Sequence, residues 1–160
     1  MLDEKMYTLF NTMLVARLKD YLARLNVEHV AVFYPMRHEV DLRDLGEMYT
    51  LYLPKIVEDE IVFYEDRGSY QKAPFNTTVP DHDEAVSMSD LEVVVVPGIV
   101  YDKNHYRIGY GKGYYDSFLS KYEGLKIGVC FDLFVIDSIP VETHDIAVDL
   151  VVTDQRIYGE

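Results

Sequence analysis

The feature that most constrains the fold is an uninterrupted run of four valines, Val93–Val96, which Pro97 and Gly98 close. Successive side chains of a strand point to opposite faces of a sheet, so an all-valine strand needs apolar cover on both faces. Strands of this kind lie in the middle of parallel sheets in α/β proteins. Such sheets bind their ligands beyond the carboxyl ends of the strands. Pro97 and Gly98 therefore mark an edge at which we expect a ligand site.

Helical and strand patterns alternate along the rest of the chain. Apolar residues at helical spacing predict a helix over residues 4–25, a second helix that starts at an Asp41 N-cap, and a third helix over 114–122. The second helix would carry Leu42, Leu45, Met48 and Leu51. Apolar runs predict strands over the following ranges: 30–34, 52–57 (interrupted by Pro54), 60–64, 92–97, 126–131 and 148–153.

Residues 66–90 are polar and contain Pro74 and Pro80, so they are predicted to form a long loop. No internal repeat or linker interrupts the chain. Helices that alternate with apolar strands predict one α/β domain over residues 1–160, with a largely parallel sheet.

The length and the cysteine content exclude several classes of protein. A chain of 160 residues has the usual size of one domain and can bury a core without disulfides or structural metals. Cys130 is the only cysteine, so an intramolecular disulfide and a cysteine-based zinc site are excluded, and its apolar strand context indicates a packing residue. No apolar run approaches the ~20 residues that span a bilayer, and the first residues lack signal-peptide character. The expected compartment is the cytoplasm.

The charge is unevenly distributed. Fifteen Lys and Arg residues against 28 Asp and Glu residues give a net charge of −13, which argues against nucleic acids and anionic membranes as partners. The acids concentrate in residues 56–92, whereas residues 103–121 hold four basic residues and one acid, Asp116. A basic, glycine-rich stretch in an acidic chain indicates a small anionic ligand that is held locally.

The most informative stretch runs from Arg107 to Asp116 and reads Arg-Ile-Gly-Tyr-Gly-Lys-Gly-Tyr-Tyr-Asp. Glycines at alternate positions let backbone N–H groups approach a ligand closely, and a helix N-terminus follows; this combination binds anions. Arg107 and Lys112 supply charges for phosphate oxygens, and Asp116 is placed to hold a magnesium ion. The spacing matches neither the Walker nor the Rossmann motif. We interpret the stretch as a nucleotide-phosphate loop; the alternative is a tight turn whose Tyr114 and Tyr115 pack into the core.

Several motifs occur in the order found in one known family. They are Tyr34-Pro-x-x-x-Glu39-Val40, Leu53-Pro-Lys-Ile56, Val96-Pro-Gly-Ile-Val-Tyr-Asp102, the 107–116 stretch, Ile139-Pro-x-Glu-x-His-Asp145 and Val151-Val-Thr153. Together they resemble the 5-formyltetrahydrofolate cyclo-ligases, also called methenyltetrahydrofolate synthetases, over residues 8–155. The 107–116 stretch with its flanks is highly specific for that family.

The resemblance implies a three-layer α/β/α fold of the kind shared with ribose-phosphate isomerases and CoA transferases. It implies an ATP-dependent ligase that closes 5-formyltetrahydrofolate to 5,10-methenyltetrahydrofolate and releases ADP and phosphate. Magnesium is the implied metal, ATP the co-substrate and one-carbon metabolism the context. The partners would then be small molecules, and we expect a monomer, with a dimer as the alternative.

The resemblance also implies roles for individual residues. The ATP phosphates would be bound by Arg107, Ile108, Gly109, Tyr110, Gly111, Lys112, Gly113, Tyr114 and Tyr115, with Arg107 and Lys112 as the catalytic charge partners. The folate would be bound by Tyr34, Glu39, Tyr110, Gly111, Lys112, Gly113 and Tyr114. Asp116 and Asp145 would be the magnesium carboxylates. In the alternative interpretation, Glu39 is a surface acid near a strand end, and His144 and Asp145 form a solvated pair.

The family pattern also has parts that this sequence lacks. Family members usually begin with an extra helix whose Lys-x-x-x-Arg pattern reaches the nucleotide phosphates, and this sequence begins after that point. Lys5, Arg17, Lys19 and Arg24 have no basic partner at that spacing, so we predict an impaired hold on ATP. Residues 68–80 lack the expected G-[IV]-x-E-P string. Two alternatives stay open: a non-catalytic relative that binds folate or a nucleotide, and an ATP-using enzyme that acts on another small formamide or amide.

Overall fold

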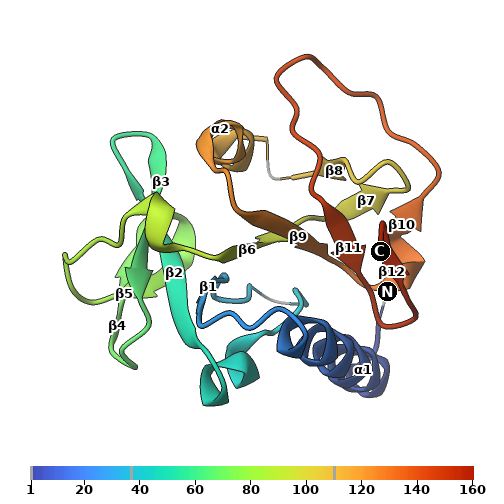
Figure 1. The fold of residues 1–160 in the computed structure, drawn as a ribbon, viewed down its shortest axis with the longest axis horizontal. Coiled ribbons are helices and arrows are strands. Elements are labelled where there is room, and N and C mark those ends of the chain that lie inside the picture. Colours follow the sequence, from blue (N-terminus) through green and yellow to red (C-terminus); the bar gives the residue numbers. More distant parts are fainter. Residues whose placement is uncertain (1, 37, 110) are drawn as a thin grey trace.

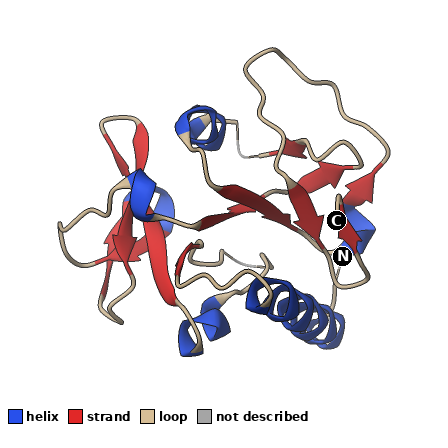
Figure 2. Ribbon diagram, in the orientation of Figure 1, coloured by secondary structure: helices blue, strands red, loops and turns tan. Residues whose placement is uncertain are grey.

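The computed structural model describes residues 2–36, 38–109 and 111–160 (Figures 1 and 2). Its α-helices are α1 (Glu4–Ala23) and α2 (Tyr114–Lys121), and its short 3₁₀ turns are η1 (Arg43–Glu47), η2 (Pro74–Asn76), η3 (Met88–Asp90) and η4 (Asp132–Phe134). Its strands are β1 (His29–Ala31), β2 (Thr50–Val57), β3 (Glu60–Glu65), β4 (Tyr70–Ala73), β5 (Thr77–Pro80), β6 (Val93–Pro97), β7 (Val100–Asp102), β8 (Arg107–Ile108), β9 (Leu125–Val129), β10 (Val135–Ile136), β11 (Leu150–Val152) and β12 (Ile157–Tyr158). None of the helices in these three ranges is long and apolar enough to cross a membrane.

The central sheet has seven strands in the order β12-β11-β9-β6-β1-β2-β3. The five strands from β11 to β2 run parallel, and the antiparallel strands β12 and β3 form the two edges. The valine strand β6 lies at the centre, between β1 and β9. The prediction of a largely parallel sheet around the valine run is confirmed.

Alternate valines of β6 are buried by different layers. Val93 and Val95 belong to the apolar cluster that includes α1, whereas Val94 and Val96 belong to the cluster that includes α2 and β7. Each of the four is at most 1% exposed. Figure 1 shows α1 on one side of the sheet, and α2 with the small sheet β10-β7-β8 on the other. The fold is therefore a three-layer α/β/α arrangement, with the small sheet in the layer of α2.

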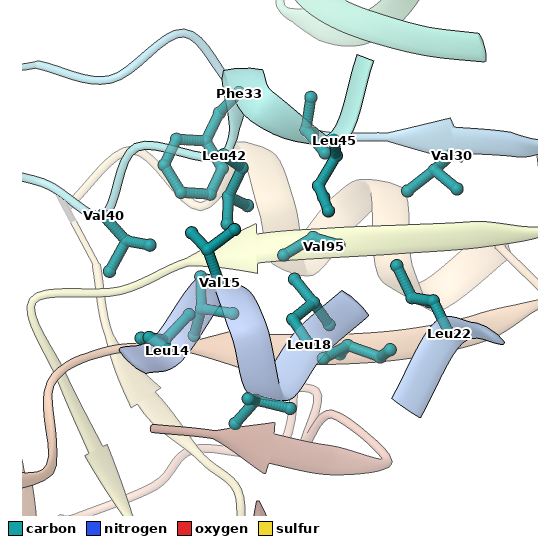
Figure 3. Packing of buried hydrophobic residues seen from close by; sticks show 14 of the residues in the cluster. Leu14, Val15, Leu18, Leu22, Val30, Phe33, Val40, Leu42, Leu45 and Val95 are labelled. Carbon is teal, nitrogen blue, oxygen red and sulfur yellow. The ribbon is translucent and has the colours of Figure 1, made fainter. Parts of the chain in front are cut away.

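Helix α1 is defined by its N-cap and its apolar stripe. The Asp3 carboxylate accepts a hydrogen bond from Met6 N at 2.8 Å, which satisfies one of the open amides of the first turn. Leu14, Leu18 and Leu22 are fully buried and face β6 (Figure 3). Full burial of a leucine side chain stabilises a protein by about 1.5–3 kcal/mol, so this stripe holds the helix to the sheet.

The predicted second helix is wrong. Residues Arg43–Glu47 form a short 3₁₀ turn, and the Asp41 carboxylate, instead of capping an α-helix, binds Arg43 through its backbone N at 3.1 Å and its guanidinium at 2.6 Å. Leu51, predicted on that helix, lies in β2 opposite Val30. Pairing of β2 with β1 begins at Thr50 and pairing with β3 begins at Tyr52, and this tertiary pairing overrides the helical spacing.

The long loop predicted over 66–90 is also wrong, because β4 and β5 form a hairpin inside it. The two strands pair antiparallel from Tyr70 opposite Pro80 to Ala73 opposite Thr77. Neither strand alternates buried and exposed residues, so no period-two pattern marks it in the sequence.

The other predicted elements occur with shifted ends. β1 ends at Ala31 rather than at residue 34, although Val32 N still donates to Tyr52 O at 2.8 Å. Pro54 does not interrupt β2. Its backbone N, like the backbone of Tyr52 two residues earlier, faces the side of β1, and β1 has already ended at Ala31. The missing N–H of Pro54 therefore costs no hydrogen bond between strands. The short strands β7, β8, β10 and β12 were not expected from the sequence.

Candidate functional site

A pocket of about 190 Å³ opens beyond the carboxyl ends of β1, β6 and β9. The segments that follow these strands supply its walls: Phe33, His38, Glu39, Val40, Pro97, Gly98, Ile99, Val129, Cys130, Phe131 and Phe134. Most of these side chains are apolar or aromatic, and Glu39 is the acid among them. The pocket thus lies at the edge that Pro97 and Gly98 mark, and it suits a flat ring with N–H donors at one end.

Glu39 is held in the pocket wall by its backbone and by its side chain. Its carboxylate accepts a hydrogen bond from Met36 N at 2.7 Å, which closes the turn that leads into it. The Tyr7 hydroxyl on α1 donates to the Glu39 carbonyl oxygen at 2.6 Å. Both contacts fix where the carboxylate lies, so Glu39 is built into the pocket rather than placed on an open surface.

Tyr34, which the resemblance places beside Glu39 at the folate, belongs to a neighbouring aromatic cluster. Its ring meets that of Tyr70 on the β4–β5 hairpin edge to face, with centroids 5.4 Å apart. Arg43 donates to the Tyr34 hydroxyl at 3.2 Å, while its hydrogen bonds to Asp41 hold the pKa of that carboxyl below its usual range. Tyr34 does not line the pocket, and its predicted contact with folate stays a prediction.

A second pocket, of about 230 Å³, lies between β3 and α2. It is lined mainly by apolar side chains, and an ion pair between Lys121 and Glu60 at 2.7 Å lies at its border. None of the residues that the motifs single out contributes to it. The pocket beyond β6, though smaller, is therefore the candidate site.

The glycine loop is joined directly to the wall of this pocket. Ile99 N donates to Ile108 O at 2.8 Å, so the strand that leads into the loop runs beside the Gly98–Ile99 wall. Gly111 and Gly113 have positive φ angles of 89° and 68°, which favour glycine, and Gly113 precedes α2 without a side-chain cap. The first amides of α2 thus lack a capping side chain, as in anion sites. Tyr110, a predicted ligand residue, lies outside the described residues.

The two cations of the loop form no ion pair with any residue of the described ranges. By contrast, Arg43 is paired with Asp41 and Lys121 with Glu60. The Arg107 guanidinium packs over the Tyr115 ring at 5.2 Å and against Gly109, and its Nε is buried without a hydrogen-bond partner in the described part of the chain. In a chain with a net charge of −13, cations left in this state favour an anionic ligand.

Phe75, which the sequence analysis missed, reaches the loop from the hairpin tip. It is 84% exposed and has a positive φ of 61°, and the Lys112 ammonium lies 5.9 Å from its ring centroid. A single exposed phenylalanine needs no special explanation, but its position beside a loop cation makes Phe75 a candidate ligand contact. The Pro74-Phe75-Asn76 string, an aromatic residue between two turn formers, is the signal in the sequence that marks it.

Asp116 and Asp145, far apart in the sequence, are brought together by one hydrogen bond. The Asp116 carboxylate accepts from Ile146 N at 3.1 Å, which places it beside Asp145. His144 lies 3.6 Å from Asp145, and no group of three or more acid, His or Cys side chains suited to a metal occurs in the ranges that the structure covers. Magnesium is commonly held by one or two carboxylates together with substrate phosphates. The donor chemistry of these two carboxylates beside the glycine loop fits that ion.

Cys130 and the loop tyrosines have structural surroundings. Burial raises the pKa of the Cys130 thiol to about 12, so the thiol stays protonated and is no nucleophile, as the sequence indicated. Tyr114 and Tyr115 pack against the apolar cluster beneath α2. The two tyrosines thus pack into the core, as the tight-turn alternative predicted. The loop before them nevertheless has the positive φ angles at Gly111 and Gly113 that an anion site would use.

A comparison with protein families decides the family. Residues 11–154 match the model of the 5-formyltetrahydrofolate cyclo-ligase family, and these residues contain the pocket, the glycine loop and both carboxylates. The chain belongs to the 5-formyltetrahydrofolate cyclo-ligase family. The resemblance carried by the sequence motifs is confirmed.

Individual relatives and a solved structure support the assignment to this cyclo-ligase family. A probable 5-formyltetrahydrofolate cyclo-ligase of Schizosaccharomyces pombe is 33% identical over 82 residues, which are 43% of this chain and 40% of that protein's length. The cyclo-ligase of Mycoplasma pneumoniae is 24% identical over 138 residues, 81% of this chain and 74% of that protein. The structure of Aquifex aeolicus 5,10-methenyltetrahydrofolate synthetase superimposes with a TM-score of 0.85 at 31% identity, covering 98% of this chain and 84% of that one.

Proposed function

We propose that the chain converts 5-formyltetrahydrofolate to 5,10-methenyltetrahydrofolate with cleavage of ATP to ADP and phosphate. Family membership across residues 11–154 supports this proposal, and one geometric observation carries it. The hydrogen bond between Ile99 N and Ile108 O joins the wall of the Glu39 pocket to the strand that enters the glycine loop. A folate ring in the pocket and phosphates at the loop would then be neighbours, as transfer between them requires.

The wall of the Glu39 pocket would supply the contacts to folate. A carboxylate has about four acceptor sites, so the contact of Glu39 with Met36 N is compatible with further bonds to the N–H groups of an aminopyrimidinone. ATP does not present such an edge in that form. The aromatic residues Phe33, Phe131 and Phe134 would pack against the ring.

The reaction requires that the two substrates be positioned next to each other and that the charge of the transferring phosphoryl group be neutralised. The formyl oxygen on N5 attacks the γ-phosphorus of ATP, and the bond from that phosphorus to the bridging oxygen of ADP breaks. N10 then adds to the formyl carbon and loses its proton, and phosphate leaves with the former formyl oxygen. No protein nucleophile takes part, which agrees with the protonated state of Cys130.

The glycine loop would bind the phosphates of ATP. Arg107 and Lys112 would neutralise the transferring phosphoryl group, and amides near Gly111 and Gly113 would bind its oxygens. Asp116 and Asp145 would hold magnesium, which when bound neutralises phosphate charge. Each charge-assisted contact to phosphate stabilises binding by roughly 1.5–3 kcal/mol.

The test is formation of the methenyl product, which absorbs in the near ultraviolet, from 5-formyltetrahydrofolate and increasing MgATP. We expect product only when ATP and magnesium are both present, with ADP released in equal amount. Protein that is folded and binds 5-formyltetrahydrofolate but forms no product at any ATP concentration would instead be the non-catalytic relative.

A further inference from the structure

Asp102, at the end of β7, is a buried carboxylate to which the proposed reaction assigns no role. Its residue is 1% exposed, and it forms no ion pair within the described parts of the chain. Its two oxygens accept three backbone hydrogen bonds: from Asn104 N and Tyr106 N, both at 3.0 Å, and from Ile139 N at 2.9 Å. An unpaired buried charge is costly, and these donors compensate it.

The three hydrogen bonds connect Asp102 to two different segments: the turn between β7 and β8, and the chain at Ile139. Those from Asn104 and Tyr106 close the turn between β7 and β8, in which Tyr106 O also accepts from Asp102 N at 2.9 Å. A neutral side chain such as asparagine would serve that turn equally well. The bond from Ile139 N needs a second acceptor oxygen, so this long-range contact is what requires a carboxylate.

Ile139 starts an exposed segment whose other end is also held by a carboxylate. Residues 139–146 have no regular secondary structure and carry His144 and Asp145; Figure 1 shows this stretch arching from β10 to β11. At its far end, Ile146 N donates to Asp116, in the first turn of α2. Asp102 and Asp116 flank the glycine loop in the sequence, and they hold the two ends of this segment in space.

We propose that Asp102 is a positioning residue that holds segment 139–146, and with it Asp145, in register with the glycine loop. The inference rests on the proposed function, because it gives Asp145 a task at the magnesium–phosphate side. Asp102 acts through Ile139 and touches no substrate. Its effect falls on magnesium and nucleotide and leaves the Glu39 pocket unchanged, since no Asp102 bond reaches that pocket.

The test compares Asp102→Asn with Asp137→Asn. The asparagine side chain in the first variant keeps an oxygen for the turn but presents an NH₂ group to Ile139 N, so only the long-range bond is lost. The control removes the same charge from a side chain that is 90% exposed and pairs with Lys103 at 2.9 Å. We expect Asp102→Asn to weaken MgADP binding by about tenfold and to raise the magnesium requirement similarly, with 5-formyltetrahydrofolate affinity within about twofold. The control should change neither.

Equal losses for MgADP and folate, or loss of MgADP affinity in the control, would overturn the proposal, because either result indicates general destabilisation or loss of surface charge. If Asp102→Asn fails to fold, amide hydrogen exchange of the wild-type protein without ligand decides. We expect the Ile139 and Ile146 amides to exchange about tenfold or more slowly than those of the exposed residues between them. If the Ile139 amide exchanged as fast as the Val141 amide, the proposal that Asp102 holds this segment would be contradicted.

The exchange measurement also separates this proposal from the proposed function. Absence of methenyl product from the wild-type protein counts against the function alone. Faster exchange over 139–146 in Asp102→Asn, with unchanged exchange in β6 and β9, supports the positioning role whatever the wild-type turnover. Unchanged exchange over 139–146 overturns it.

Discussion

The carboxylate of Asp116 accepts a hydrogen bond from the backbone N of Ile146 at 3.1 Å. This contact crosses from the first turn of α2 to the segment before β11 and places Asp145 beside the end of the glycine loop. Two acids that are 29 positions apart in the sequence therefore lie at one edge of the glycine loop.

Replacing Asp145 tests this arrangement. Asp145→Asn keeps an oxygen that can accept from Glu142 N, now bonded at 2.8 Å, but removes the charge that would hold magnesium. We expect the magnesium concentration for half-maximal ADP binding to rise by about tenfold or more, measured by calorimetry. Glu142→Gln is the matched control, since its carboxylate is exposed and lies beside His144 rather than at the loop. An unchanged magnesium requirement in Asp145→Asn would remove Asp145 from the site.

Replacing Lys112 tests whether the glycine loop binds phosphate. Its ammonium has no carboxylate partner in the described residues, so Lys112→Ala leaves no buried charge unpaired and should fold normally. We expect ATP affinity to fall by at least about tenfold, because one charge-assisted phosphate contact is lost. Lys121→Ala, on the same loop–helix unit but paired with Glu60, should leave ATP affinity unchanged. Calorimetry that finds the two variants alike would contradict the loop assignment.

Phe75 at the hairpin tip is expected to contact a ligand, and stability measurements can separate this role from packing. Because the residue is 84% exposed, Phe75→Ala should change the free energy of unfolding by less than about 0.5 kcal/mol. Binding of ATP or 5-formyltetrahydrofolate should nevertheless weaken by about fivefold or more, because an aromatic contact is lost. Unchanged affinity for both ligands would show that the ring serves neither.

Glu39→Gln separates folate recognition from folding. The amide oxygen of glutamine can still accept from Met36 N, so the turn before the residue is kept. Its NH₂ group opposes the N–H donors of the ligand, and we expect 5-formyltetrahydrofolate affinity to fall by about tenfold or more, with ATP affinity within about threefold. Titrations of both ligands decide, and parallel losses would give Glu39 a structural role.

Alkaline pH should destabilise the protein through its buried thiol and phenols. Burial raises the pKa of the Cys130 thiol to about 12, and burial also raises the pKa of the Tyr101 and Tyr122 hydroxyls. The folded state then keeps protons that the unfolded chain releases above about pH 8.5–10, so the free energy of unfolding falls as the pH rises toward 12. Each such group contributes a slope of about 1.4 kcal/mol per pH unit.

Urea unfolding at about pH 8, 9.5 and 11 measures this effect. Cys130→Ala removes one of the groups, so its stability should fall less steeply between about pH 9 and 11 than that of the wild-type protein. An equal slope in both proteins would show that Cys130 ionises as readily in the folded state as in the unfolded chain.

Part of the geometry of the candidate site was predictable because its signals are local. The glycines of the 107–116 stretch report the backbone that the chain must adopt there, and Gly111 and Gly113 do have positive φ. Glu39 was identified by a motif, and it does line the pocket beyond β1. Phe75 was missed because the hairpin beneath it shows no alternation of buried and exposed residues.

The sequence by itself determined the central strand and the layers around it, because four adjacent valines leave no face of β6 for solvent, whatever the neighbours are. It also determined, through the glycines, the positive φ angles of the loop at Gly111 and Gly113. Only the tertiary structure decided that Arg43–Glu47 is a short turn, that β7, β8 and β10 form a second sheet, and that Asp102 and Asp116 meet residues of the 139–146 segment. Each of these outcomes depends on partners distant in the sequence, whose pairing free energy no local pattern contains.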